Sequence, residues 1–269
     1  MPARSPGTLA QGIQSVETGG ALLQALVTFG SPMMLKDLAG AAGMPPAKAH
    51  RYLVSFIRLG LAQQDPVSGR YALGGFALQM GLAALGRLDA VRIASGILPE
   101  LAPRLGTTVA VAVWGNKGAT IVRWEDSRDI VTVNVRAGGV MPLLTSATGR
   151  CFAAWLPPGA TALMIQAELD ANSPGRRAAP RSLAAVSRLL APVRRAGLAR
   201  AEGSLIPGIN ALSAPVFDHR GAMILALTAL GYAGTFDCSD DGPVARDLRA
   251  VAKTLSHQLG ATAAEGGLR

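Results

Sequence analysis

The sequence has few of the residues, and none of the motifs, that common catalytic and redox sites require. Only two cysteines, Cys151 and Cys238, occur among 269 residues, which favours free thiols in a reducing compartment over a disulfide framework. The patterns CxxC, HExxH, GxSxG, Walker A and GxGxxG are all missing. Cys151 fits a reactive thiol at a helix N-terminus, but a small buried cysteine is the simpler interpretation.

Histidines and long apolar runs are also scarce. His50, His219 and His257 are far apart in the sequence and lack the spacing of metal ligands, so we expect no metal site and no cofactor. No stretch is apolar for long enough to span a bilayer, and residues 1–12 lack the apolar core of a signal peptide. We therefore expect a cytoplasmic protein without a membrane partner.

The sequence is rich in apolar residues and carries an excess of positive charge. Hydrophobic residues make up 49% and charged residues 16%, a composition that supports a sizeable core. The net charge of +9 favours a polyanionic partner such as nucleic acid. The alternative is a preference for solubility, because the excess is spread along the chain.

Three amphipathic helices are predicted before residue 60, over residues 15–29, 35–42 and 46–59. The second has apolar residues at i, i+3, i+4 and i+7 and ends at Gly43, which suits a left-handed C-cap. Pro45–Pro46 then suits the start of the third helix. This is the helix-turn-helix layout, whose second helix enters the DNA major groove.

The third helix leaves a basic face for a partner. Its apolar stripe separates Lys48, Arg51, Ser55 and Arg58 from the helix side that packs on the first two helices. An ordinary three-helix cluster with a solvated basic face explains these features equally well.

The next segment favours DNA binding. Residues 61–64 and 70–73 flank residues 65–69, where a proline and a glycine predict a hairpin turn. A hairpin directly after a recognition helix is a wing, from which Arg70 would reach phosphate or the minor groove. A solvated hairpin arginine is the alternative.

The remainder predicts an α+β domain with a mostly antiparallel sheet. Helices are expected over residues 89–105, 148–156, 160–169, 181–197 and 239–260, and strands over residues 107–114, 119–125, 130–135, 208–217 and 223–230. Residues 74–86 fit a linker helix with a role in dimer contacts, or a core helix of the second domain. A basic stretch fits a solvated helix face, with a DNA or subunit contact as the lesser alternative; it comprises Arg176, Arg177, Arg181, Arg188, Arg194 and Arg195.

With these motifs in order, the chain resembles the IclR family of transcription regulators from about Val16 to Gly260. The matching segments are LKDLAGAAGMP (35–45), AHRYL (49–53), RLGL (58–61), GRYALG (69–74), MPLLTSATGR (141–150) and INALSAPVFD (209–218). Two departures concern Ala47–Lys48 and Met34, where family members often have Ser or Thr. Caps are worth only about 1 kcal/mol, so the fold survives, while the operator sequence is left open.

The resemblance implies a winged helix-turn-helix joined by a linker helix to a GAF-like effector-binding domain, in a homodimer or homotetramer. The expected boundaries are residues 1–12 for a flexible tail, 13–74 for the DNA-binding domain, 75–88 for the linker helix, 89–262 for the effector domain and 263–269 for a second tail. Double-stranded operator DNA is the expected partner. The candidate DNA-binding residues are Lys48, His50, Arg51, Ser55 and Arg70.

The resemblance also places the effector loop at residues 145–149, where small residues precede a helix and a helix N-terminus favours a carboxylate. Plain N-capping by Thr145 or Ser146 is the alternative. The candidate effector-binding residues are Thr145, Ser146, Ala147, Thr148, Gly149, Glu202, Asn210 and Thr228. Apolar Ala211 and Leu230 indicate a less polar effector, an aromatic or branched acid, with Trp114 and Trp124 as a wall or as core.

We therefore expect an effector-responsive, DNA-binding transcriptional regulator rather than an enzyme, with a small organic acid as its effector. Two other classes stay open at this point. One is a winged-helix protein–protein adaptor, and the other is a GAF-like enzyme that modifies its ligand.

Overall fold

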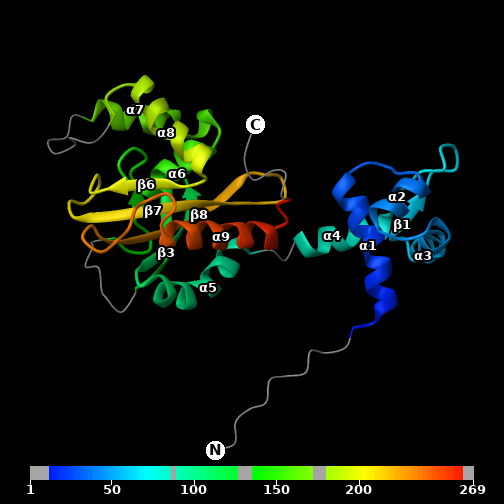
Figure 1. Cartoon of the computed structure of the whole chain (residues 1–269). Helices are drawn as coiled ribbons and strands as arrows, with labels where there is room; N and C mark the ends of the chain where they lie inside the picture. Colours follow the sequence, from blue (N-terminus) through cyan, green and yellow to red (C-terminus); the bar gives the residue numbers. More distant parts are fainter. Residues whose placement is uncertain (1–11, 86–88, 127–134, 172–179, 263–269) are drawn as a thin grey trace, which may run out of the picture. The chain divides into compact units, whose positions relative to one another are not determined.

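The computed structural model describes residues 12–85, 89–126, 135–171 and 180–262. The chain forms two compact units, residues 1–88 and residues 89–269, which are considered separately. The first contains a three-helix cluster with a small hairpin, and the second contains a six-stranded sheet between helices (Figure 1). The predicted α+β class is confirmed.

The first unit has the expected winged helix-turn-helix elements. They are α1 (Gln14–Phe29), α2 (Leu35–Ala41), α3 (Pro46–Arg58), β1 (Ala62–Gln64), β2 (Tyr71–Leu73) and α4 (Gly75–Leu85). β1 and β2 pair antiparallel. Leu22, Leu38, Leu53 and Tyr71 are among the buried residues of its core.

Glycine ends α2 as the sequence predicts. Gly43 has a φ of +63°, a conformation that costs a residue with a Cβ more than it costs glycine. The N–H of the next residue, Met44, donates to the carbonyl of Ala39 at 3.0 Å. The chain thus reverses within a few residues, and Pro46 begins α3.

The second unit is built on an antiparallel sheet with strand order β5-β4-β3-β8-β7-β6. Its strands are β3 (Thr108–Gly115), β4 (Gly118–Glu125), β5 (Val140–Met141), β6 (Ala199–Glu202), β7 (Ile209–Phe217) and β8 (Met223–Tyr232). Its helices are α5 (Ala90–Leu105), α6 (Ala147–Trp155), α7 (Pro158–Asp170), α8 (Leu183–Ala196) and α9 (Pro243–Gln258).

The helices form a layer on each face of the sheet (Figure 1). α5 and α9 pack on one face through Leu98, Leu101, Leu248 and Leu255. α6, α7 and α8 lie on the other face, where Phe152 is the largest fully buried side chain. Since side chains alternate along a strand, β3, β4, β7 and β8 contribute to both cores.

Several elements differ from the expectation. β5 and β6 were not predicted, because two and four residues are too few for a periodic pattern. The strand predicted over residues 130–135 lies outside the described residues apart from Val135, as do Arg176 and Arg177. In the parts of the chain that the structure describes, no helix is long and apolar enough to cross a membrane.

Candidate functional site

A small cavity of about 50 Å³ lies in the second unit, between the sheet and the N-terminus of α6. Side chains from all six strands of the sheet, from the start of α6 and from the loop after β6 surround it. The lining residues are Ala110, Ile121, Trp124, Val135, Met141, Ser146, Ala147, Thr148, Ala201, Leu205, Ile206, Ile209, Ala211, Thr228 and Leu230.

Small residues on the sheet make room for this cavity. Ala110 of β3 lies opposite Thr228 of β8, and Ala211 of β7 lies opposite Leu230 of β8 and Ala201 of β6. Their side chains therefore share the face that α6 covers. Three alanines on that face leave space that larger residues would fill.

The polar groups of the cavity gather at the start of α6. The Ser146 hydroxyl caps the helix: it accepts from the N–H of Gly149 at 2.8 Å and donates to the carbonyl of Pro142 at 2.7 Å. N-capping, the simpler interpretation of this serine, is thus present. Among the described residues, the N–H groups of Ala147 and Thr148 have no hydrogen-bond partner, so they remain available to an anion.

A row of hydroxyl groups crosses the cavity floor to a buried thiol. The Thr148 and Thr228 hydroxyls lie 2.9 Å apart, and Thr228 donates to Ser213 at 2.9 Å. Burial raises the pKa of the Cys151 thiol to about 12, and a hydrogen bond from the Ser213 hydroxyl opposes this. At neutral pH Cys151 is therefore a protonated, inaccessible thiol and a poor nucleophile.

Four of the eight sequence-predicted effector residues line the cavity, namely Ser146, Ala147, Thr148 and Thr228. Thr145 is buried beside it, and its carbonyl accepts from Ser204. Gly149 faces the backbone instead, since a Cβ there would come within 2.0 Å of the Pro142 carbonyl oxygen.

The other two predicted residues, Glu202 and Asn210, lie opposite each other in the register of β6 and β7. Glu202 is exposed and forms an ion pair with Arg200 at 3.4 Å. Of the two tryptophans considered as a wall, Trp124 lines the cavity, whereas Trp114 packs on Phe152 with ring centroids 5.7 Å apart.

Sequence reasoning missed the loop after β6. Leu205 and Ile206 line the cavity from that loop, and Ile209 lines it from the start of β7. The signal for the strand before this loop is the alternation of buried Ala199 and Ala201 with Arg200 and Glu202. Four residues are too few for that alternation to identify a strand from the sequence.

In the first unit, α3 separates a buried side from a basic one. Ala49 and Leu53 are fully buried, while the sequence-predicted Lys48, Arg51 and Ser55 are exposed. The Ser55 hydroxyl donates to the Arg51 carbonyl at 3.3 Å. His50 is exposed, with Nδ1 3.5 Å from the Tyr71 hydroxyl of β2. The basic face is thus rigidly presented on a packed helix.

The wing turn is held by its own side chains. The Asp65 carboxylate accepts from the N–H groups of Val67 and Ser68, and these bonds hold the pKa of Asp65 below its usual value. Arg70 donates to the Pro32 carbonyl at 3.2 Å, so its charge is held next to the segment before α2.

No candidate metal centre accompanies these sites. Within residues 12–85, 89–126, 135–171 and 180–262, no group of three His, Cys, Asp or Glu residues is arranged to hold a metal ion.

Two family models match the chain. The model described as "IclR helix-turn-helix domain" matches residues 15–66. The model described as "Bacterial transcriptional regulator IclR C-terminal" matches residues 82–257, more than half of the chain.

Similar proteins cover almost the whole chain. The glycerol operon regulatory protein of Streptomyces griseus is 30% identical over 262 residues, 94% of this chain and 99% of that protein. The crystal structure of HmgR from Pseudomonas aeruginosa has a TM-score of 0.84 and 41% identity, covering 93% of this chain and 100% of its own. An IclR homolog from Microbacterium hydrocarbonoxydans, solved in complex with 4-hydroxybenzoate, has a TM-score of 0.55 and 19% identity, covering 92% of this chain and 99% of its own. At this identity the likeness is evidence for the fold alone.

Proposed function

The chain belongs to the IclR family of bacterial transcriptional regulators, with a helix-turn-helix domain and an effector domain, and we propose that a small carboxylate with an aromatic or branched apolar body controls its binding to operator DNA. The observation that supports this ligand class is the cavity of the second unit. Its walls are mostly apolar, and two unpartnered N–H groups lie at the N-terminus of α6. An apolar body would pack on Trp124 and Leu230, while its carboxylate accepts from Ala147 and Thr148.

One solved relative supports an aromatic acid. Its title names 4-hydroxybenzoate as the bound molecule. Thr228 donates to Ser213 and Thr148 donates to Thr228, so both hydroxyl oxygens can still accept a hydrogen bond, for example from a hydroxyl group on the ligand.

The DNA contacts are assigned to α3 and the wing. Lys48, His50, Arg51 and Ser55 are exposed on one helix that contains no acidic residue. We propose that they reach bases or phosphates in the major groove, with Arg70 anchoring the wing. Two copies of α3, one helical turn apart on the DNA, would read a two-fold symmetric operator.

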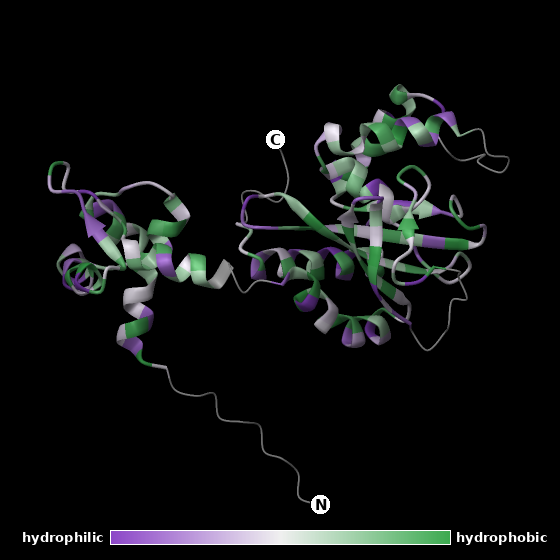
Figure 2. Cartoon of the chain, turned by 180° about the vertical axis from the view of Figure 1, so that it is seen from behind, coloured by the Kyte–Doolittle hydropathy of each residue, from purple (hydrophilic) through white to green (hydrophobic). Residues whose placement is uncertain are grey.

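Pairing of subunits is assigned to α4. Phe76, Leu78, Met80 and Leu82 are between 47% and 64% exposed, and most of α4 has the colours of apolar residues in Figure 2. A surface helix this apolar is expected to bury its side chains against another chain. A homodimer or homotetramer is therefore proposed.

The two other classes receive less support. An enzyme would need an activated group, and the thiol of Cys151 is buried and protonated at neutral pH. The named relatives are regulators. A protein–protein adaptor would leave the basic face of α3 without a function.

The test is a titration of the full-length protein against fluorescent DNA from its own upstream region, with unrelated DNA as the control, at several salt concentrations. We expect selective binding whose log affinity falls steeply with log salt, by about 0.9 per phosphate contact. Aromatic carboxylates added at saturation should then shift the affinity. Failure to bind either DNA would favour the adaptor.

A further inference from the structure

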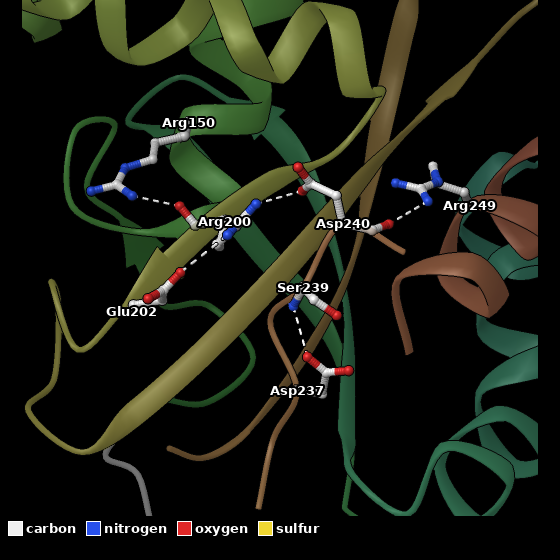
Figure 3. A network of polar contacts seen from close by, with 7 residues as sticks. All are labelled: Arg150, Arg200, Glu202, Asp237, Ser239, Asp240 and Arg249. Atoms are coloured by element: carbon white, nitrogen blue, oxygen red, sulfur yellow. Dashed lines mark hydrogen bonds and ion pairs between the residues drawn. The ribbon is translucent and has the colours of Figure 1, made fainter. Parts of the chain in front are cut away.

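Arg150 of α6 is a buried cation that contacts both rims of the cavity without lining it. The residue is only 7% exposed. Its Nε donates to the Leu144 carbonyl at 2.9 Å, Nη1 to the Arg200 carbonyl and Nη2 to the Ser204 hydroxyl at 3.2 Å. Figure 3 shows this guanidinium beside the backbone of Arg200. The Ser204 hydroxyl in turn donates to the carbonyl of Thr145 at 3.0 Å.

The charge of Arg150 has no carboxylate in contact. Its three acceptors are neutral oxygens, and among the described residues no ion pair involves it. Burial lowers the pKa of Arg150, and the charge of Glu202 opposes this, but the Glu202 carboxylate is exposed and bonds Arg200. A buried charge without a contacting counter-charge is unfavourable, and an approaching anion relieves that cost.

This charge lies directly behind the cavity wall. Three residues of this hydrogen-bond network precede lining residues in the chain: Thr145 precedes Ser146, Arg200 precedes Ala201, and Ser204 precedes Leu205. No carboxylate lines the cavity. Two carboxylates outside the lining reduce the positive potential: Glu202 acts on Arg150 through space, and Glu168 accepts from the N–H groups of Leu143 and Leu144 before α6. Neither carboxylate contacts the guanidinium, so part of the potential of Arg150 and of the α6 N-terminus still reaches the cavity. In a mostly apolar site the potential is weakly screened.

We infer that Arg150 determines the charge specificity of the cavity, attracting a carboxylate through space without a hydrogen bond to it. This inference rests on the proposed function, since it assigns one residue to the selection of the proposed ligand class. The alternative role of Arg150 is purely structural: its hydrogen bonds would hold the neighbouring segments together, a role called a clamp below. The two roles differ in one observable: a clamp affects charged and neutral ligands alike, whereas a charge affects only the anion.

The test measures acid and amide binding side by side. Isothermal titration calorimetry on the full-length protein uses benzoate, phenylacetate and 4-hydroxybenzoate, each with its primary amide. We expect the wild type to bind at least one acid about tenfold more tightly than its amide. Arg150→Gln should reduce that ratio at least fivefold, and Arg150→Lys should keep it within twofold although both ligands bind more weakly.

The outcomes separate this inference from the proposed function. If Arg150→Gln weakens acid and amide equally, Arg150 is a clamp and the inference fails while the proposed ligand class stands. If Arg150→Gln does not fold, Arg150→Met serves as the neutral variant: an unchanged ratio of acid to amide affinity overturns the inference, and a ratio reduced at least fivefold supports it. If the wild type binds none of the six compounds, the proposed ligand class fails and the inference fails with it.

Discussion

At the scale of single residues, Arg51 offers a direct test of the DNA surface. It is exposed on α3 between Lys48 and Ser55, and its guanidinium has no ion pair among the described residues. Arg51→Ala should weaken operator binding and reduce the salt slope by about 0.9 if the side chain neutralises one phosphate. Fluorescence anisotropy at four or more salt concentrations measures both quantities.

Arg123→Ala is the matched control, because Arg123 is an exposed arginine on β4 in the effector unit. It removes the same charge from the chain and should leave the slope unchanged. An equal change in both variants would show that net charge, rather than the α3 face, accounts for the effect.

The Cys151 thiol predicts a pH effect on stability. Burial raises its pKa from 9.0 to about 12, so the folded state favours the protonated thiol. That contribution is fully present below pH 9 and is lost as the pH rises from 9 toward 12, by at most about 1.4 kcal/mol per pH unit. Relative to Cys151→Ala, the wild type should lose unfolding free energy above pH 9.

Urea denaturation of both proteins at pH 7, 8, 9 and 10 checks this difference. Cys151→Ala is destabilised at every pH by the cavity that the smaller side chain leaves. The informative quantity is therefore how the difference in unfolding free energy between the two proteins changes with pH. A difference that stays constant up to pH 10 would mean that the thiol titrates alike in both states.

At the scale of elements, the start of α6 depends on close backbone packing at Gly149. An added Cβ would lie 2.0 Å from the Pro142 carbonyl oxygen and 2.6 Å from the Leu143 Cα, and these are backbone atoms that cannot swing away. Gly149→Ala should therefore displace α6 and lower the free energy of unfolding by about 1–3 kcal/mol. Chemical denaturation measures the loss.

Gly96→Ala in α5 is the contrasting substitution. Its added Cβ meets nothing within 4 Å, so the helix should gain about 0.5–1 kcal/mol from reduced backbone entropy in the unfolded chain. Equal destabilisation by both alanines would argue against a special role for the α6 contact.

The elements also show what periodicity reveals and what it does not. The sequence predicts α2 and α3 because their apolar residues recur every three or four positions and Gly43 lies between them. It does not predict β6, whose four residues alternate small and charged side chains. The cavity itself depends on the pairing of Ala110 with Thr228 and of Ala211 with Leu230. Ala110 is far from β7 and β8 in the chain, so no local pattern reveals the cavity.

The helix α4 predicts subunit association. Leu78 is 64% exposed, and burying such a side chain against another chain contributes roughly 1.5–3 kcal/mol. Leu78→Glu should shift the protein toward monomers in sedimentation velocity at micromolar concentration. Leu163→Glu on α7, where the leucine is 86% exposed, is the control. Unaltered association in Leu78→Glu would remove α4 from the interface.

At the scale of the whole molecule, an effector acts on DNA binding only through its differential affinity for the DNA-bound and free states. The coupling is reciprocal: if a saturating aromatic acid lowers operator affinity tenfold, saturating operator must lower the affinity for that acid by the same factor per coupled site. Anisotropy titrations of DNA with and without the acid give the first factor. Calorimetric titration of the acid into protein with and without operator gives the second.

This prediction depends on the cavity and not on the basic face of α3. In Arg51→Ala, both affinities for DNA should fall while the coupling factor stays the same, because the substitution does not touch the cavity lining. In Gly149→Ala, the acid should bind weakly and the coupling should vanish, because the N–H groups of α6 are displaced. An acid that binds the wild type tightly and leaves operator affinity unchanged would show that the cavity is a ligand site without control over DNA.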